Sequence, residues 1–417
     1  MIHKNVKEIV GKNFPVIIVG SGPAGITLAL SLEQSKIDCL IIEAGSEEYT
    51  DESQENYAAK IIGDQITDLR YSRLRQLGGT SGHWGGWCKP IEKWNVEKWG
   101  IKYNSFSKLK DQTCKILEIE NNFQQSKLSN FYSQIQFQYS KVRFGDKYKN
   151  HLSNSKHIHL LVNAQVTHLS GGNKIFESIS VSQNKENIRL KSNFFILCAG
   201  GIENSRILLW SKEKDGSLIN NNLPIGKYWI THPWIIGGVG FLYKSKIEKI
   251  LNENFINYDG PIHIATNSEL VNEKKILSGA MYMNAKEDTK LYKEIVKDFL
   301  CVAPEYGKKI AKSIFGKDLK CGNIFMNLEE PPKEANKITL DKKIIDKNGV
   351  PITNLYYKKS KETLNSAKTI LVELGKLFVE KDIGRIALKS EIENLDSYEN
   401  LGVHHHMGGT RIGNNFK

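Results

Sequence analysis

The first segment suited to chemistry is a glycine-rich turn near the start of the chain. Residues 20–25 read Gly-Ser-Gly-Pro-Ala-Gly and fit the pattern G-x-G-x-x-G. Such glycines let the backbone approach a pyrophosphate, and the following helix N-terminus supplies amide donors and partial positive charge. Glu43 follows about 20 residues after this turn, which is the sequence separation at which an acidic residue typically binds a ribose hydroxyl. The pattern predicts an adenine dinucleotide, which the turn alone leaves open between NAD and FAD.

Three consecutive histidines, His404, His405 and His406, form a second reactive segment. A histidine can accept a proton near neutral pH because its unperturbed pKa is about 6.5. It can also bind a metal, but consecutive side chains of an extended chain alternate in direction. Three of them do not easily ligate one ion, so we expect no metal site.

The elements around the turn form a βαβ unit. Residues 14–19 are a continuous apolar run, as in a strand buried on both faces, and residues 38–43 repeat this pattern after a helical stretch. This unit implies a right-handed crossover and a parallel sheet. Residues 193–199 and then 201–211 read as another buried strand and helix.

Strand-like alternation dominates beyond about residue 235. Residues 175–190 read as a hairpin, and residues 361–381 read as an amphipathic helix. Asn348-Gly349 carries strong turn chemistry.

Composition excludes several classes of function. The chain has 417 residues and a net charge of +12, but its lysines are scattered and no basic run is interleaved with aromatics, which argues against nucleic-acid binding. The six cysteines show no zinc-like spacing. A second G-x-G-x-x-G turn is missing, which disfavours a two-nucleotide reductase or flavin monooxygenase. No signal peptide or apolar run of about 18–20 residues is present, so we expect a cytoplasmic protein without a transmembrane segment.

Four ordered segments resemble the glucose–methanol–choline oxidoreductases, which use FAD. They are residues 43–45 (EAG), residues 77–87 (LGGTSGHWGGW), residues 198–209 (CAGGIENSRILL) and residues 404–413 (HHHMGGTRIG). Asn163 to Val166, His232-Pro233 and residues 336–351 are weaker matches. The second and fourth segments are most similar to the bacterial sugar dehydrogenases and pyranose oxidases.

The resemblance implies a cofactor, a reaction and a set of site residues. The family moves a hydride from an alcohol carbon to flavin N5 while a histidine takes the hydroxyl proton. Alignment on Arg411 and Gly413 makes His405 the catalytic base, with His406 as the alternative. His83 stands where some members carry a covalent flavin link; packing beside the flavin is the other reading. The implied FAD contacts are Gly20, Gly22, Pro23, Ala24, Gly25, Glu43, Ala44, Gly78, Gly79, Thr80, Ser81, His83, Trp84, Val166, Ala199, Gly200 and Asn204.

The resemblance also implies an α/β fold, with a Rossmann-like FAD-binding domain built from discontinuous segments and a substrate domain with a mostly antiparallel sheet and helices. We expect the FAD-binding domain in residues 10–100, 150–235 and 395–417, a helical connection in 101–149 and the substrate domain in 236–394.

Family members normally continue past the fourth segment with a strand, a second catalytic residue and a final helix. The sequence ends at Lys417, so we expect a C-terminally truncated member. The leading hypothesis is an FAD-dependent oxidoreductase acting on the CH–OH group of a small sugar or other alcohol. The alternative is a non-catalytic FAD-binding remnant.

Overall fold

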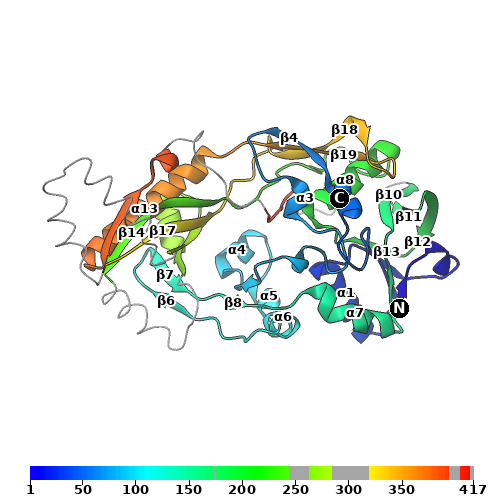
Figure 1. The fold of residues 1–417 in the computed structure, drawn as a ribbon, viewed down its shortest axis with the longest axis horizontal. Helices are drawn as coiled ribbons and strands as arrows, with labels where there is room; N and C mark the ends of the chain where they lie inside the picture. The colour runs from blue at the N-terminus through cyan, green and yellow to red at the C-terminus, as the bar shows by residue number, and fades with distance from the viewer. Residues whose placement is uncertain (173–174, 244–262, 284–318, 394–403, 414–417) are drawn as a thin grey trace.

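The computed structural model describes residues 1–172, 175–243, 263–283, 319–393 and 404–413. Figure 1 shows an elongated molecule with a parallel sheet near one end and a large antiparallel sheet near the other. Helices α4 (Lys93–Lys98), α5 (Tyr103–Ser107) and α6 (Lys110–Leu117) lie between these sheets. No helix in the described ranges is long and apolar enough to cross a membrane.

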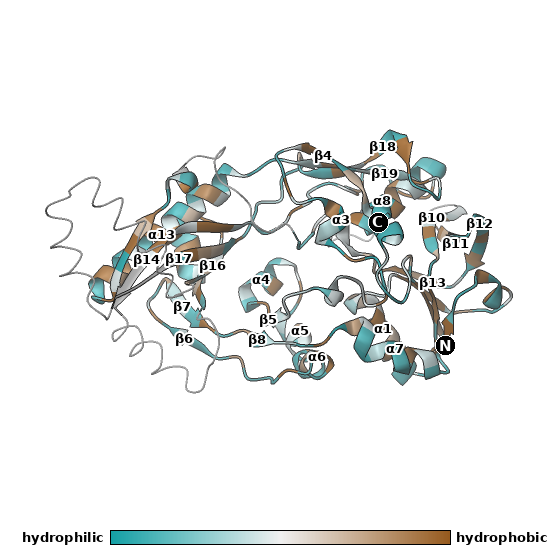
Figure 2. Ribbon diagram, viewed as in Figure 1, coloured by the Kyte–Doolittle hydropathy of each residue, from teal (hydrophilic) through white to brown (hydrophobic). Residues whose placement is uncertain are grey.

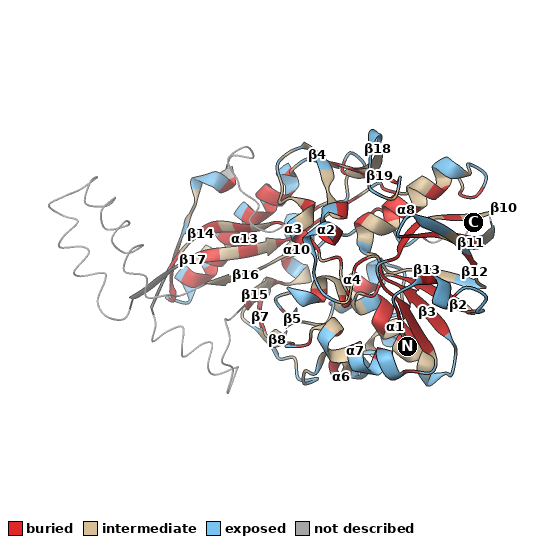
Figure 3. Cartoon of the chain, turned by 45° about the vertical axis from the view of Figure 1, so that its right-hand side comes forward, coloured by how far each residue is buried: buried red, intermediate tan, exposed pale blue. Residues whose placement is uncertain are grey.

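The three central strands of the parallel sheet are buried on both faces. Its order is β1-β9-β3-β2-β13, and every pairing is parallel. The strands are Ile2–His3, Ile158–Leu161, Cys39–Ile42, Val16–Val19 and Phe194–Leu197 in that order. All residues of β2, β3 and β9 are buried. Figure 3 shows this for β2 and β3, and burial on both faces explains their continuous apolar runs.

Helices and a smaller sheet cover the parallel sheet. Helices α1 (Pro23–Gln34) and α7 (Phe144–Asn154) pack on β9. On one face of the parallel sheet, Ile17 and Leu40 belong to the same apolar cluster as Ile179 and Val181 of an antiparallel sheet. That sheet contains β10 (Gln165–Gly172), β11 (Ile175–Gln183) and β12 (Glu186–Lys191), and β10 also contacts α8 (Gly200–Lys214). The βαβ unit predicted from the sequence is therefore present.

The large antiparallel sheet has the order β20-β14-β17-β16-β15-β7-β6. Its strands are Gly384–Leu388, Trp234–Tyr243, Leu319–Leu328, Gly279–Met283, His263–Thr266, Tyr132–Ile135 and Gln125–Lys127 in that order. Helix α13 (Lys361–Glu380) covers the sheet, and Ile370 and Leu374 belong to its apolar cluster with Met326. Apolar and polar residues alternate along α13 in Figure 2, so its apolar face lies on the sheet.

A separate three-stranded sheet pairs segments that are far apart in the sequence. Strands β18 (Lys337–Ile345) and β19 (Pro351–Tyr357) form a hairpin, and β19 pairs in parallel with β4 (Ala59–Gly63). The remaining short elements are α2 (Asp51–Gln54), α3 (Leu69–Ser72), α10 (Ser268–Lys274) and the ribbon of β5 (Trp87–Cys88) with β8 (Gln138–Tyr139), together with 3-10 turns at Val6–Glu8, Glu55–Tyr57, Gly79–Gly82 and Ser390–Glu393.

Residues 101–149, which were expected to be helical, also contain strands β6, β7 and β8. Strand β7 reads YSQI and has no apolar run. Its extended conformation depends on pairing with β15, which is remote in the sequence. The proposed domain boundaries stay a prediction, and residues 244–262, 284–318, 394–403 and 414–417 of those intervals lie outside the described residues.

Arg206 joins helix α8 to the β18–β19 hairpin. Its side chain is 4 % exposed, and Nη2 donates to Asp346 Oδ2 at 2.7 Å and to the Val350 carbonyl at 3.1 Å. Its Nε donates to the Pro351 carbonyl at 2.8 Å. A buried guanidinium with this many acceptors orients the hairpin on α8. Its removal would leave the buried Asp346 carboxylate without a cation.

Replacing Arg206 with Met should therefore lower the free energy of unfolding by about 3–5 kcal/mol, the cost of leaving Asp346 buried without its cation. Chemical denaturation measures this change. Arg189→Met on the exposed side of β12 is the matched control, and it should shift the midpoint little. Equal effects of the two variants would contradict the anchoring role of Arg206.

Candidate functional site

The glycine turn connects β2 to α1 in a close-packed loop. The Gly20 amide donates to the Ile42 carbonyl at 2.9 Å, which joins the turn to β3. A Cβ on Gly25 would lie 2.0 Å from the Gly20 carbonyl oxygen, so this position requires glycine. Among the described side chains, none caps α1 at Gly22. The first amides of α1 therefore stay available to an anion.

Glu43 is held beside this turn at the end of β3. Its Oε2 accepts from the Ser21 backbone amide at 3.0 Å and from the Ser21 hydroxyl at 2.7 Å, and its Oε1 accepts from the Gly45 amide at 2.8 Å. Glu43 is buried, and these donors fix its orientation. A carboxylate has about four lone-pair sites, so capacity remains for further hydroxyl donors.

These residues line one wall of a cavity of about 590 Å³. Among the residues expected at the site, the cavity is lined by Gly20, Gly22, Pro23, Ala24, Glu43, Ala44, Gly79, Thr80, Val166, Ala199, Gly200, Asn204, His405 and His406. Six separate stretches of the sequence thus converge on one space, namely residues 20–24, 43–44, 79–80, 166, 199–204 and 405–406.

Five expected residues stand behind or beside this wall. Gly25 packs inside the turn, and the Gly78 amide donates to the Ser21 carbonyl at 3.0 Å. The Ser81 hydroxyl donates to the Gly78 carbonyl at 2.6 Å. Trp84 donates through Nε1 to the Val142 carbonyl at 2.9 Å, as a packing residue does. His83 is exposed, and its covalent link stays a prediction.

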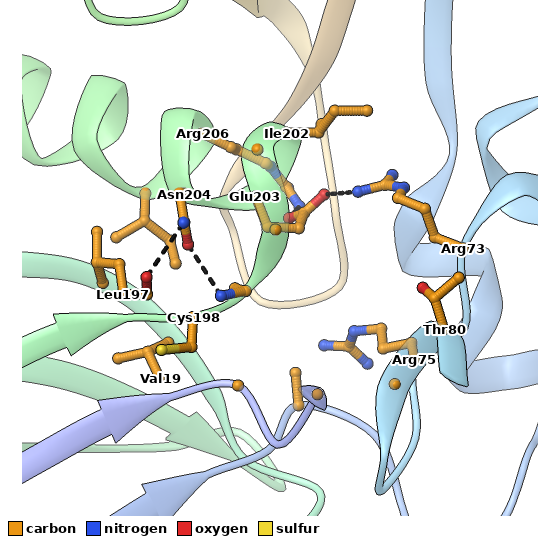
Figure 4. A pocket seen from close by; sticks show the side chains of 18 of the residues that line it. Val19, Arg73, Arg75, Thr80, Leu197, Cys198, Ile202, Glu203, Asn204 and Arg206 are labelled. Atoms are coloured by element: carbon orange, nitrogen blue, oxygen red, sulfur yellow. Dashed lines mark hydrogen bonds and ion pairs between the residues drawn. The ribbon is translucent and has the colours of Figure 1, made fainter. Parts of the chain in front are cut away.

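Asn204 connects β13 to α8. Its Oδ1 accepts from the Ala199 amide at 2.9 Å, and its Nδ2 donates to the Leu197 carbonyl at 3.2 Å (Figure 4). Both ends of the amide are occupied by backbone groups. Asn204 therefore shapes the cavity by holding the strand-to-helix turn.

A charged wall that the sequence analysis missed faces this turn. Arg73 and Arg75 extend from the loop before the Gly78-Gly79 pair, and Arg73 reaches Glu203 of α8 (Figure 4). Arg73 Nη1 donates to Glu203 Oε1 at 2.8 Å, and its guanidinium lies 3.9 Å from the centre of the Tyr57 ring. The available signal was the Arg-x-Arg spacing just before two glycines, to which the sequence analysis assigned no role.

Arg73 retains donors for a ligand. It is 8 % exposed, and its Nε and Nη2 have no hydrogen-bond partner within the described part of the chain. In contrast, Arg75 is held by Ser53 Oγ at 2.9 Å and Gln165 Oε1 at 2.7 Å. Unsatisfied buried donors are costly, so the two Arg73 groups indicate a place for an acceptor.

Glu203 is charged despite its burial. Desolvation alone would raise its pKa, but the guanidinium groups of Arg73 and Arg206 reverse this and hold the pKa below its usual range. The cavity thus contains a carboxylate fixed between two cations, and Arg73 is neutralised on one side only.

The histidine segment reaches the cavity through a backbone bridge. Met407 and Ile230 exchange two backbone hydrogen bonds, of 2.9 and 3.0 Å, in an antiparallel bridge. Gly408 has φ of +80°, and a Cβ there would lie 2.0 Å from the Tyr228 carbonyl oxygen. The Met-Gly-Gly sequence therefore seats this segment on residues 226–232.

The two candidate bases point to different partners. His405 Nδ1 is hydrogen-bonded to His232 Nε2, and their ring centres are 4.4 Å apart. His406 Nε2 bonds the Ser72 hydroxyl at 2.9 Å, and its ring stacks on Trp229. His406 is thus enclosed by packing, whereas His405 stands at an exposed position of the cavity wall.

All three rings favour the neutral form. His405 keeps an accessible edge, but the protein atoms packed around the rest of its ring desolvate it; this effect, followed by the nearby His404, lowers the pKa of His405. Burial, followed by the Arg73 charge, lowers the pKa of His406 well below its usual value. Burial, followed by His405, lowers the pKa of His232 to about 4. In the described ranges, no three His, Cys, Asp or Glu side chains are arranged to hold a metal ion.

A second cavity of about 700 Å³ has His232 in its lining. It is formed by α4 and its preceding loop together with strands of the large sheet. Its polar and aromatic lining includes Lys89, Glu92, Trp94, Asn95, Gln125, Phe137, Asn267 and Asn327. The His232–His405 contact therefore joins two cavities.

The fold belongs to an architecture seen in oxidases. The structure of pyridoxine 4-oxidase from Mesorbium loti is similar, with a TM-score of 0.57 and 12 % identity over 95 % of this chain and 88 % of that chain. A formate oxidase gives 0.50 and 14 % over 96 % and 89 %. A mutant formate oxidase from Aspergillus oryzae RIB40, described for its FAD modification, gives 0.51 and 14 % over 97 % and 90 %.

No protein-family model and no curated protein matches the sequence. At these identities the structural likeness establishes the fold. It confirms the predicted α/β class, with a Rossmann-like layer from discontinuous segments beside a mostly antiparallel sheet. The resemblance to the glucose–methanol–choline oxidoreductases is thus supported for the fold, and the sugar-enzyme branch stays a prediction.

Replacing Gly408 with Ala should displace the histidine segment from residues 226–232, because the added methyl would collide with the Tyr228 carbonyl. Hydrogen–deuterium exchange should then be faster at Ile230 and Met407, whose amides form the bridge. Gly349→Ala is the matched control, since it has a similar φ of +73° but no neighbour within 4 Å. Unchanged exchange in the Gly408 variant would show that the bridge does not hold this segment.

Proposed function

We propose that the chain is an FAD-dependent oxidoreductase that oxidises a CH–OH group of a sugar or another small alcohol. The observation that carries this proposal is the position of His405. It lines the cavity of the nucleotide turn and bonds His232, which lines the second cavity. The oxidases of similar fold act, by name, on pyridoxine and formate, and one is described with FAD.

The residues of the first cavity fit FAD by their donor set. The free amides of α1 and the open space at Gly22 suit the pyrophosphate, and Glu43 suits a ribose. The unpartnered Nε and Nη2 of Arg73 supply further donors for the acceptor atoms of the cofactor. When bound, the flavin of FAD supplies the hydride-accepting chemistry.

The chain's own residues handle the proton and the substrate. His405 is neutral at pH 7, so its Nε2 can accept the hydroxyl proton of the alcohol. His406, held between Ser72 and Trp229, keeps the segment in place and is the alternative base. The second cavity combines amides, charged groups and Trp94, a lining suited to a hydroxyl-rich molecule such as a sugar.

Replacing Gly22 with Ala should weaken FAD binding by at least about tenfold, or ~1.4 kcal/mol. A Cβ on Gly22 meets no atom within 4 Å, and its φ of −71° suits alanine. The methyl group therefore enters the space assigned to the pyrophosphate without disturbing the fold. Equilibrium titration with FAD and thermal unfolding measure the two effects. Gly216→Ala is the control, because a Cβ there also meets no atom within 4 Å. Equal FAD affinity in the original protein and both variants would contradict the placement of the pyrophosphate at Gly22.

The proposed reaction is tested by mixing the FAD-loaded protein anaerobically with a panel of hexoses, polyols and primary alcohols. A substrate should bleach the flavin absorbance, and His405→Gln should slow this by about 10²–10⁴-fold with little change in FAD affinity. The base must be unprotonated and its pKa is lowered, so the rate should fall only on acidification below the ordinary histidine value of about 6.5. Bound FAD that no member of the panel reduces would instead support the non-catalytic alternative.

A further inference from the structure

The pairing of His232 with His405 is set by the backbone. Met407 and Ile230 form an antiparallel bridge, so residues two positions away on either side stand opposite one another. His405 precedes Met407 by two residues, and His232 follows Ile230 by two. Side chains in directly opposite positions are close enough to touch, and the two imidazole ring centres lie 4.4 Å apart.

The contact constrains which nitrogen carries the proton. A neutral imidazole has one N–H donor and one acceptor nitrogen, so His405 Nδ1 and His232 Nε2 share a single hydrogen. If the hydrogen is on His405 Nδ1, then His405 Nε2 is an acceptor and can act as a base. If it is on His232 Nε2, then His405 Nε2 carries the proton and cannot act as one.

The surroundings keep His232 uncharged. It is half-buried, and its Nδ1 is buried without a partner in the described part of the chain. Burial, His405 and His404 lower its pKa to about 4. The other groups near the pair are His406, which Arg73 faces, and Glu330, which accepts from the Thr231 backbone and the Tyr357 hydroxyl. Burial raises the pKa of Glu330 to about 7, so this carboxyl is only partly ionised near neutral pH.

We propose that His232 is a positioning residue that accepts the Nδ1 hydrogen of His405 and thereby keeps His405 Nε2 free as the base. This inference rests on the proposed function. Oxidation of the alcohol breaks its O–H and C–H bonds: the proton passes to His405 Nε2, and the hydride passes to the flavin. The resulting imidazolium keeps its Nδ1 hydrogen bond to the neutral His232.

The experiment compares His232→Leu with His232→Gln in the FAD-loaded 417-residue chain. Leucine removes the acceptor, whereas the glutamine side-chain oxygen can replace Nε2 as an acceptor that does not titrate. His151→Leu, on the exposed surface of α7, is the matched control. Two quantities are measured. The first is the tautomer of His405 in 15N-histidine NMR spectra, in which the His405 signal is assigned by its absence in His405→Gln. The second is the pH profile of flavin reduction by a sugar or alcohol of the panel that reduces the flavin.

We expect His405 to be the Nδ1–H tautomer in the original protein, in the glutamine variant and in the control. In the leucine variant the Nε2–H form should appear, and flavin reduction should slow by about tenfold or more with its acid limb at lower pH, because the imidazolium loses an acceptor. The glutamine variant should stay within about threefold of the original rate.

An unchanged tautomer and an unchanged pH profile in His232→Leu would overturn the inference. An equal decrease in the rate of flavin reduction in the leucine and glutamine variants would also overturn it, since that pattern indicates a structural role. The proposed function fails separately, if no sugar or alcohol reduces the flavin of the original protein. The NMR spectra would still decide in that case whether His232 orients His405.

Discussion

The antiparallel bridge between Ile230 and Met407 is the contact on which the candidate site depends. It joins the histidine segment to the chain that leads into β14, the second strand of the large sheet. The same segment contacts the start of α8, because a Cβ on Gly201 would approach the His406 carbonyl at 3.1 Å. One short segment therefore touches the helix beside the nucleotide turn and the strand of the opposite sheet. Its backbone hydrogen bonds place His405 where two cavities meet.

Buried charge organises the other wall of the same cavity. Arg73, Glu203, Arg206 and Asp346 form a chain of ion pairs from the loop before the glycine pair, through α8, to the β18–β19 hairpin. Burying such groups costs free energy, so each ion must be paired and hydrogen-bonded. Arg206 and Asp346 meet this condition through the hairpin carbonyls and Gln165. Within the described residues Arg73 does not, since its Nε and Nη2 have no hydrogen-bond partner there, and it lines the space that we assign to FAD.

The likeness to oxidases at 12–14 % identity is explained by what each part of the fold requires. A parallel sheet needs apolar strands and a tight glycine turn, and many sequences satisfy this. The second cavity is lined by side chains from several unrelated segments. Its chemistry can therefore change while the fold is retained, and the cavity's own residues determine which substrate fits.

Local patterns in the sequence determined the elements of this protein. Apolar runs identified β2, β3 and β13, the six residues from Gly20 to Gly25 identified the nucleotide turn, and periodicity identified α13. These features are readable because each depends on residues close together in the chain. Strand β7 was not readable, since it depends on pairing with β15.

Only the tertiary structure decided which side chains act together. Arg73 and Glu203 are 130 residues apart, and His232 and His405 are 173 apart. No periodicity or spacing encodes such pairs, because they form where separate segments converge on one cavity. The sequence thus determined the glycine turn and the histidine segment, and the fold determined which side chains hold that segment in position.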